Sequence, residues 1–277
     1  MLPNTRRYLS DSPLVNLAEG IQGRIQPGLG DRILWIHGYT LDSSSWGELW
    51  RQLPDYQHIG IDLPGHGASA AIDPTMDLRS LGIKLANLCS EQEIQHIIAL
   101  SFGTITAIQT ALEFHGELAS LTLAAPAIAG GPQDSYMAQV YGELFQLNMQ
   151  GADPKNLGDK WLSCRAWDGL DDLPGLRTAL SSLVWKHSWA ELQSFAIRQF
   201  TFPEQPASAL QGIIAPTLVL VGQREMLAYR QCAEILAQTL PNCRLQELPN
   251  VDHLCLLQAP DDSAKLIAAH LRQFAKN

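Results

Sequence analysis

The sequence predicts an α/β fold built on a doubly wound, mostly parallel sheet, with a helical segment inserted between two strands of the C-terminal half. Short apolar runs recur along the chain, each ending in small or turn-forming residues, and amphipathic helical patterns lie between them. From about residue 133 to about residue 200 the strand-like runs stop. Alternating strands and helices imply right-handed crossovers, with helices on both faces of the sheet.

The apolar runs are predicted to be strands buried on both faces of the sheet. They are too short for helices and do not alternate between apolar and polar residues, as is typical of parallel strands. The runs are Ile33–Ile36, Ile59–Ile61, Ile97–Leu100, Leu121–Ala125, Thr217–Val221 and, before the last helix, Cys243–Leu248.

One-sided apolar stripes predict the helices that cover the sheet. Two stripes have the same i, i+3, i+7, i+10 spacing. They are Leu78, Leu81, Leu85 and Leu88, and Ala264, Ile267, Leu271 and Phe274.

Residues 128–208 are predicted to form a helical cap, and residues 1–127 and 209–277 to form the α/β core. The cap segment holds helical stretches separated by Pro- and Gly-containing turns, and four of the seven tryptophans. Because an insertion between parallel strands sits over the strand ends, it can roof a crevice there.

Composition excludes several classes of function. With 19 basic and 28 acidic residues the net charge is −9, and no basic cluster follows Arg6 and Arg7, so a nucleic acid is not expected as a partner. Hydrophobic residues make up 46% and charged residues 17% of the chain, which is typical of a folded domain with a large core.

The expected compartment is the cytoplasm. The five cysteines are scattered and odd in number, which favours buried thiols in a reducing environment over disulfides or a zinc site. The N-terminus has no apolar signal region, and polar residues interrupt the longest uncharged stretch, Ile94–Leu112, so no membrane span is expected.

The strongest chemical signal is a serine placed between a strand and a helix. The run Ile97–Leu100 leads directly into Ser101, a helical pattern starts at once, and the residues two before and two after, Ala99 and Gly103, are small. Such a turn raises the hydroxyl above the sheet, and small neighbours let strand and helix approach. The pentapeptide alone is equally compatible with a serine that caps a helix.

A base and an acid follow in the order that this architecture requires. A free hydroxyl is a weak nucleophile, so it needs a base within hydrogen-bond reach and a carboxylate that orients the base. His253 lies on a loop after Cys243–Leu248, and Glu225 lies on a loop after Thr217–Val221. Both loops belong to the carboxyl edge of the predicted sheet, and the order Ser, acid, His is the expected one.

Together these motifs resemble the α/β-hydrolase fold superfamily with a helical cap, and the resemblance covers nearly the whole chain. The matching segments are Leu34–Tyr39, Asp62–Ser69, the turn around Ser101, Val219–Gly222 and Val251–Leu254. The resemblance implies that Ser101 is the nucleophile, His253 the base and Glu225 the acid. It also implies an oxyanion hole formed by the backbone N–H groups of Tyr39 and Phe102.

Two positions depart from the usual pattern of the superfamily. Glutamate replaces the usual aspartate at Glu225, and Asp252 replaces the usual glycine before the histidine. Asp252 is therefore a rival acid, but a residue adjacent to His253 on an extended loop points away from it, so Glu225 is preferred. The alternative for Glu225 is an exposed loop carboxylate paired with Arg224.

No metal or other cofactor is expected. The glycines near Asp62 lack the lysine of a phosphate-binding loop and the spacing of a dinucleotide site, and Asp62 and His66 have no metal-binding pattern around them. Aromatic residues near the oxyanion loop and in the cap are candidates for an apolar substrate pocket, although most such residues form core. The candidates are Trp46, Tyr136, Tyr141 and Trp161.

The expected function is a serine hydrolase that cleaves an ester or related acyl compound with an apolar group through an acyl-enzyme. Within the same superfamily, a C–C bond hydrolase or a biosynthetic lyase or cyclase using the same Ser/His pair remains an alternative, and a ligand receptor without turnover is a more distant one. The substrate is a small molecule of unassigned identity, and the sequence leaves the oligomeric state open.

Overall fold

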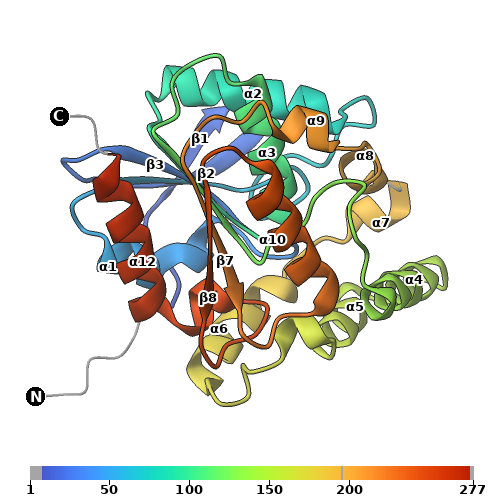
Figure 1. Ribbon diagram of the computed structural model, residues 1–277. Helices are drawn as coiled ribbons and strands as arrows, with labels where there is room; N and C mark the ends of the chain where they lie inside the picture. Colours follow the sequence, from blue (N-terminus) through green and yellow to red (C-terminus); the bar gives the residue numbers. More distant parts are fainter. Residues whose placement is uncertain (1–7, 195, 275–277) are drawn as a thin grey trace, which may run out of the picture.

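The computed structural model describes residues 8–194 and 196–274, which form an eight-stranded sheet flanked by helices (Figure 1). The strand order is β1-β2-β4-β3-β5-β6-β7-β8, and strands from β4 to β8 across the sheet are parallel. The strands are β1 (Leu14–Ala18), β2 (Ile21–Gln26), β3 (Arg32–Ile36), β4 (Gln57–Ile61), β5 (His96–Leu100), β6 (Ser120–Ala124), β7 (Thr217–Gly222) and β8 (Cys243–Leu248).

Burial explains why these runs form the centre of the sheet. Every residue of β5, β6 and β7 is buried, because helices cover both faces of these strands. β8 lies at the edge of the sheet. Its residues are exposed or half-buried, except for the last one, which is buried. The predicted strands are therefore confirmed, with their ends shifted by one or two residues.

Two layers of helices cover the sheet. On one side lie α1 (Gly47–Gln52), α11 (Cys255–Gln258) and α12 (Pro260–Gln273); on the other lie α2 (Leu78–Glu91), α3 (Phe102–Glu113) and α10 (Leu227–Thr239) (Figure 1). The leucine stripe of α2 is buried, and a capping box between Asp77 and Ser80 starts this helix. The prediction of a doubly wound α/β fold is confirmed.

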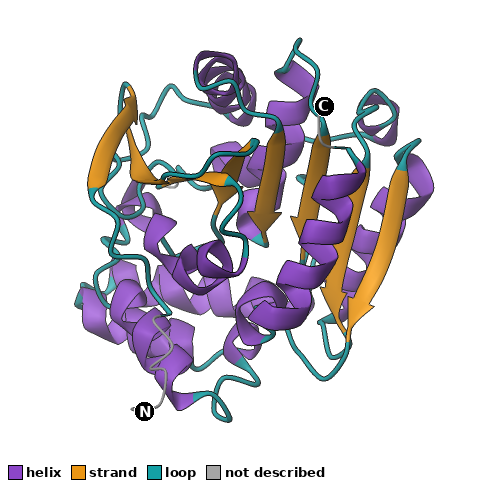
Figure 2. Ribbon diagram, turned by 90° about the vertical axis from the view of Figure 1, so that its left-hand side faces the viewer, coloured by secondary structure: helices purple, strands orange, loops and turns teal. Residues whose placement is uncertain are grey.

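The segment between β6 and β7 is helical, as expected. It contains α4 (Ser135–Met149), α5 (Pro154–Leu162), the 3₁₀ turn η2 (Arg165–Trp167), α6 (Pro174–Val184), α7 (Ala190–Ser194), α8 (Arg198–Thr201) and α9 (Ala207–Leu210). The arrowheads of the parallel strands point toward the end of the molecule where the insertion lies (Figure 2). The expected boundary at residue 208 falls inside α9, which packs on α3 and α10.

The N-terminal hairpin was not among the predicted strands. β1 pairs with β2, and β2 with β4, in antiparallel fashion. These two strands at the end of the sheet are partly exposed and carry polar residues, so they lack the continuous apolar run that marks the buried strands. None of the helices in the described part of the chain is both long enough and apolar enough to cross a membrane. A cytoplasmic location stays a prediction.

Candidate active site

Ser101 sits in a strained turn between β5 and α3. Its φ of 53° and ψ of −124° are unusual for a residue with a side chain, and its N–H donates to Ala124 O at 2.8 Å in the next strand. Gly103 is required nearby, because a Cβ there would lie 2.4 Å from His37 O and 2.6 Å from Ile36 O. The turn therefore holds the serine at the start of a helix, above the carboxyl edge of the sheet.

The three side chains singled out for chemistry meet at this point. Ser101 Oγ lies 2.7 Å from His253 Nε2, and His253 Nδ1 lies 2.9 Å from Glu225 Oε1. Because a carboxylate only accepts, Nδ1–H donates to Glu225, which leaves the Nε2 lone pair to accept the Ser101 hydroxyl. All three residues are buried, so the chain of hydrogen bonds is screened from bulk water.

Asp252 is turned away from the histidine and is held by Arg224. Arg224 Nη2 lies 2.8 Å from Asp252 Oδ2, and its Nε contacts both carboxylate oxygens at 3.2 Å. This pairing raises the pKa of Arg224. Of the two carboxylates considered from the sequence, Glu225 is the one that hydrogen-bonds His253, and Arg224 pairs with Asp252 rather than with Glu225.

Two backbone N–H groups lie beside the serine. Phe102 is the first residue of α3, and Tyr39 lies in the loop after β3; in the described part of the chain neither N–H donates a hydrogen bond. His37 braces this loop, since its Nε2 accepts from Leu63 N at 3.0 Å and its Nδ1 donates to Gly38 O at 2.8 Å. Burial lowers the pKa of His37, which keeps this bracing ring neutral.

The side chain of Tyr39 joins this loop to the helical insertion. Its hydroxyl donates to Glu191 Oε1 at 2.5 Å, and His187 Nε2 lies 2.9 Å from the same oxygen. Burial alone would raise the pKa of Glu191, but the hydrogen bond and charge of His187, together with the Tyr39 hydroxyl, lower it. Burial first, and then the Glu191 charge, raise the pKa of Tyr39. A buried carboxylate thus ties the insertion to the loop that carries the Tyr39 N–H.

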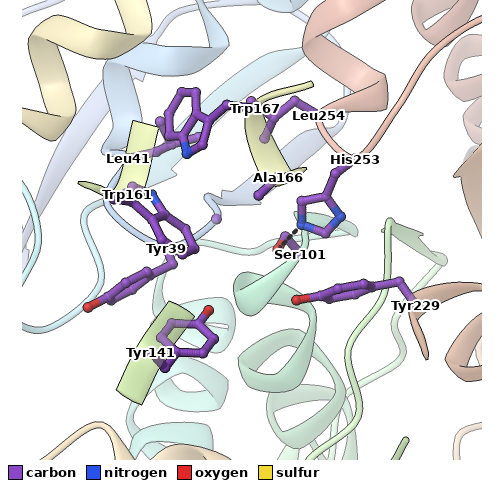
Figure 3. A pocket seen from close by; sticks show the side chains of 11 residues that line it. Tyr39, Leu41, Ser101, Tyr141, Trp161, Ala166, Trp167, Tyr229, His253 and Leu254 are labelled. Carbon is purple, nitrogen blue, oxygen red and sulfur yellow. Dashed lines mark hydrogen bonds between the residues drawn. The ribbon is translucent and has the colours of Figure 1, made fainter. Parts of the chain in front are cut away.

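Two hollows of very different size meet at Ser101. The small chamber has a volume of about 20 Å³ and the large cavity about 430 Å³. Both are lined by Ser101, Tyr39, Tyr141 and Tyr229. The rest of the small chamber is formed by Gly38, Leu41, Trp161, Ala166, Trp167, His253 and Leu254 (Figure 3). The walls of the large cavity are mostly apolar and include Ile105, Ile128, Met137, Phe145, Leu192 and Ile197.

Of the four aromatic residues predicted to line a pocket, two line a hollow at Ser101 and two do not. Tyr141 lines both hollows and Trp161 lines the small chamber. Trp46 and Tyr136 line neither, which corrects the expectation for these two residues. Trp46 is fully buried against Trp35, with ring centroids 5.1 Å apart, and serves the core. The guanidinium carbon of Arg165 lies over the Tyr136 ring, 4.7 Å from the centroid of that ring.

Several residues at the site were missed from the sequence. The Tyr229 ring packs on that of His253 with centroids 4.4 Å apart, and Tyr229 lines both hollows. Its position in the first turn of α10, four residues after Glu225, is a signal that could have identified it. Glu191, Ala166 and Trp167 carry no such signal, because only the folding of the insertion over the sheet brings them to Ser101.

Within residues 8–194 and 196–274, no group of three or more His, Cys, Asp or Glu side chains is arranged to hold a metal ion. Two buried histidines, His66 and His187, lie beside Tyr39. The ring centroids of His66 and His187 are 4.7 Å apart. The pKa of His66 is well below its usual value, mainly because of burial and then because His187 and His37 lie close by.

Comparison with known proteins identifies the family. A model of the alpha/beta hydrolase family matches residues 33–266. The chain belongs to this family. A pimeloyl-[acyl-carrier protein] methyl ester esterase of Nitrosospira multiformis is 23% identical over 252 residues, which cover 84% of this chain and 92% of the relative. A monoacylglycerol lipase of Homo sapiens is 22% identical over 265 residues, covering 88% of this chain and 76% of the relative.

A solved structure has the same fold. A thermophilic esterase from Thermogutta terrifontis superposes with a TM-score of 0.75 at 22% identity, covering 92% of this chain and 95% of the esterase. The expected superfamily and the expected class of enzyme, an α/β-hydrolase, are therefore confirmed.

Proposed function

We propose that this α/β-hydrolase cleaves carboxylic esters with an apolar group through a covalent acyl-enzyme on Ser101. The observation that carries the proposal is the hydrogen-bonded chain from Ser101 through His253 to Glu225, located where an apolar cavity of about 430 Å³ meets the carboxyl edge of the sheet. A binding protein has no need of a buried base and acid joined to a strained serine.

In the proposed reaction, His253 Nε2 takes the Ser101 proton as Oγ attacks the ester carbonyl. The imidazolium that forms carries its second N–H against the Glu225 carboxylate, which stabilises the new charge and maintains the ring orientation. The backbone N–H groups of Tyr39 and Phe102 stabilise the oxyanion, each by about 3 to 4 kcal/mol. His253 then protonates the leaving alkoxide, and water cleaves the acyl-enzyme by the same steps in reverse order.

The insertion, residues 128–208, is proposed to act as a cap. Its apolar side chains, among them Met137, Phe145 and Leu192, form one wall of the large cavity, and the core supplies the opposite wall. An ester with a substantial apolar group gains about 0.8 kcal/mol for each methylene that it buries there. The relatives support an ester as substrate, since one of them is a methyl ester esterase and another a monoacylglycerol lipase.

A fluorophosphonate probe tests the proposed nucleophile. The wild-type chain is expected to be labelled at Ser101 and to hydrolyse methyl octanoate, with release of acid measured by pH-stat titration. Ser101→Ala is expected to lose both labelling and hydrolysis while retaining its thermal unfolding transition. Strong labelling of the folded Ser101→Ala protein would exclude Ser101 as the nucleophile. A wild-type enzyme that is labelled but leaves simple esters intact would favour a lyase or C–C bond hydrolase.

A further inference from the structure

The two hollows at Ser101 differ about twentyfold in volume, and they are not equivalent with respect to His253. Among the described residues that line them, Ser101, Tyr39, Tyr141 and Tyr229 belong to both, whereas His253 belongs to the small chamber alone. The His253 imidazole therefore faces the small chamber, and the leaving group of the reaction is expected on the same side (Figure 3).

General acid catalysis decides which half of an ester occupies which hollow. The group that takes the proton from Ser101 must return a proton to the leaving oxygen, so that oxygen has to lie within hydrogen-bond reach of His253 Nε2. The alkoxide half is then on the His253 side, in the small chamber. The acyl half, bonded to Ser101 Oγ, extends in the other direction into the large cavity.

The walls of the small chamber limit the size of the alcohol. Three of them come from the insertion: Trp161, Ala166 and Trp167 are all buried, and the Trp161 ring packs edge-on against Tyr39 with centroids 5.2 Å apart. Leu254, which follows His253 in the chain, also lines the chamber. With about 20 Å³ against about 430 Å³ in the large cavity, the chamber favours a small alcohol group over a large one.

The second half of the reaction requires the same small occupant. Because hydrolysis of the acyl-enzyme retraces the first step, the attacking water takes the position that the leaving oxygen has vacated, next to His253. The small chamber admits this water and favours a methoxy group over longer alkoxy groups. A glyceryl group, with three carbons and two further hydroxyls, is much larger than either.

We propose that the enzyme is selective for esters of very small alcohols, above all methyl esters, with a long and largely apolar acyl chain. This proposal rests on the proposed function, because it assumes that His253 protonates the leaving group. It assigns the small chamber to the alcohol and the large cavity to the acyl chain. It also separates this chain from a glyceride lipase, which has to accommodate glycerol as the leaving group.

Two series of substrates test the assignment through opposite trends in kcat/KM. With octanoate as the acyl group, kcat/KM is expected to fall about tenfold for each carbon added to the alcohol from methyl to butyl, and monooctanoylglycerol is expected to be a poor substrate. With methanol as the alcohol, kcat/KM is expected to rise about fourfold for each acyl methylene from butyrate to octanoate.

Substitutions in the two hollows provide a matched pair. Trp161→Leu widens the small chamber and is expected to raise the butyl-to-methyl ratio of kcat/KM at least tenfold. Phe145→Leu alters the large cavity alone and is expected to change the acyl series while leaving that alcohol ratio within about twofold. Trp167→Leu serves the same purpose if Trp161→Leu does not fold, and the wild-type series does not depend on either variant.

The outcomes distinguish this inference from the proposed function. A flat or rising alcohol series in wild-type enzyme that is labelled at Ser101 would overturn the assignment of the small chamber and leave ester hydrolysis intact. Efficient cleavage of monooctanoylglycerol would do the same. Absence of both labelling and hydrolysis with every ester would instead overturn the proposed function.

Discussion

Replacement of Glu225 by glutamine isolates the part played by the buried carboxylate. The Glu225 side chain is fully buried, and its Oε1 accepts from His253 Nδ1 at 2.9 Å and from Met226 N at 2.9 Å. Glutamine keeps the shape but removes the negative charge that faces the imidazolium, and its amide N–H₂ can turn toward Nδ1 and favour the wrong tautomer. We expect kcat to fall about 10⁴-fold, as in the equivalent carboxylate-to-amide change in serine proteases. This corresponds to about 5.4 kcal/mol in the activation barrier.

Asp252→Asn is the matched control for this experiment. Its carboxylate pairs with Arg224, whose side chain is half exposed, so the loss of the charge is expected to cost about 1 kcal/mol or less in unfolding free energy and to change kcat less than about threefold. Both variants are assayed with methyl octanoate by pH-stat titration after their thermal unfolding has been compared. If Asp252→Asn lost 10³-fold or more while Glu225→Gln stayed within tenfold, the reasoning about the acid would be refuted.

Three further predictions concern strain, pH and the insertion. Ser101→Gly should be about 1 kcal/mol more stable to urea than Ser101→Ala, because glycine relieves the φ of 53°; equal stability would argue against strain. His58 accepts from Trp35 Nε1 at 3.1 Å and burial lowers its pKa to about 4, so the unfolded chain takes up the proton first below pH 6.5. Stability should therefore fall by about 1.6 kcal/mol between pH 6.5 and 5 in urea titrations, and less in His58→Gln. Tyr39→Phe should lower the unfolding free energy by about 2 kcal/mol and kcat several-fold, since Glu191 loses a buried donor; an unchanged kcat would show that the Tyr39 N–H does not depend on this anchor.

The local sequence pattern around Ser101 predicted the site of the reaction, which the composition of the chain did not. A strand, a serine, small residues on both sides and an immediate helix are constraints that neighbouring residues impose on one another, and they can be recognised in a short window. The same holds for the strands β3 to β8, whose continuous apolar runs follow from burial on both faces. The hairpin β1–β2 was missed because half-exposed strands need no such run.

The pocket residues could not be assigned in this way. Trp46 and Trp161 are both buried aromatic residues, yet one packs beneath the sheet against Trp35 and the other lines the small chamber. What separates them is the path of the insertion over the strand ends, which depends on packing between segments more than a hundred residues apart. Periodicity and residue type carry no information about that path.

From the sequence alone came the parallel strands β3 to β8, the helical nature of the insertion, and the serine, glutamate and histidine at the carboxyl edge of the sheet. Tertiary structure alone decided that Arg224 pairs with Asp252 while Glu225 reaches His253, that Glu191 anchors Tyr39, and that the space around Ser101 is divided so unequally. The physical reason is the range of the forces involved. Backbone preferences and side-chain periodicity act between near neighbours in the chain, whereas the choice between two carboxylates and the volume of a hollow depend on contacts that exist only once distant segments have packed together.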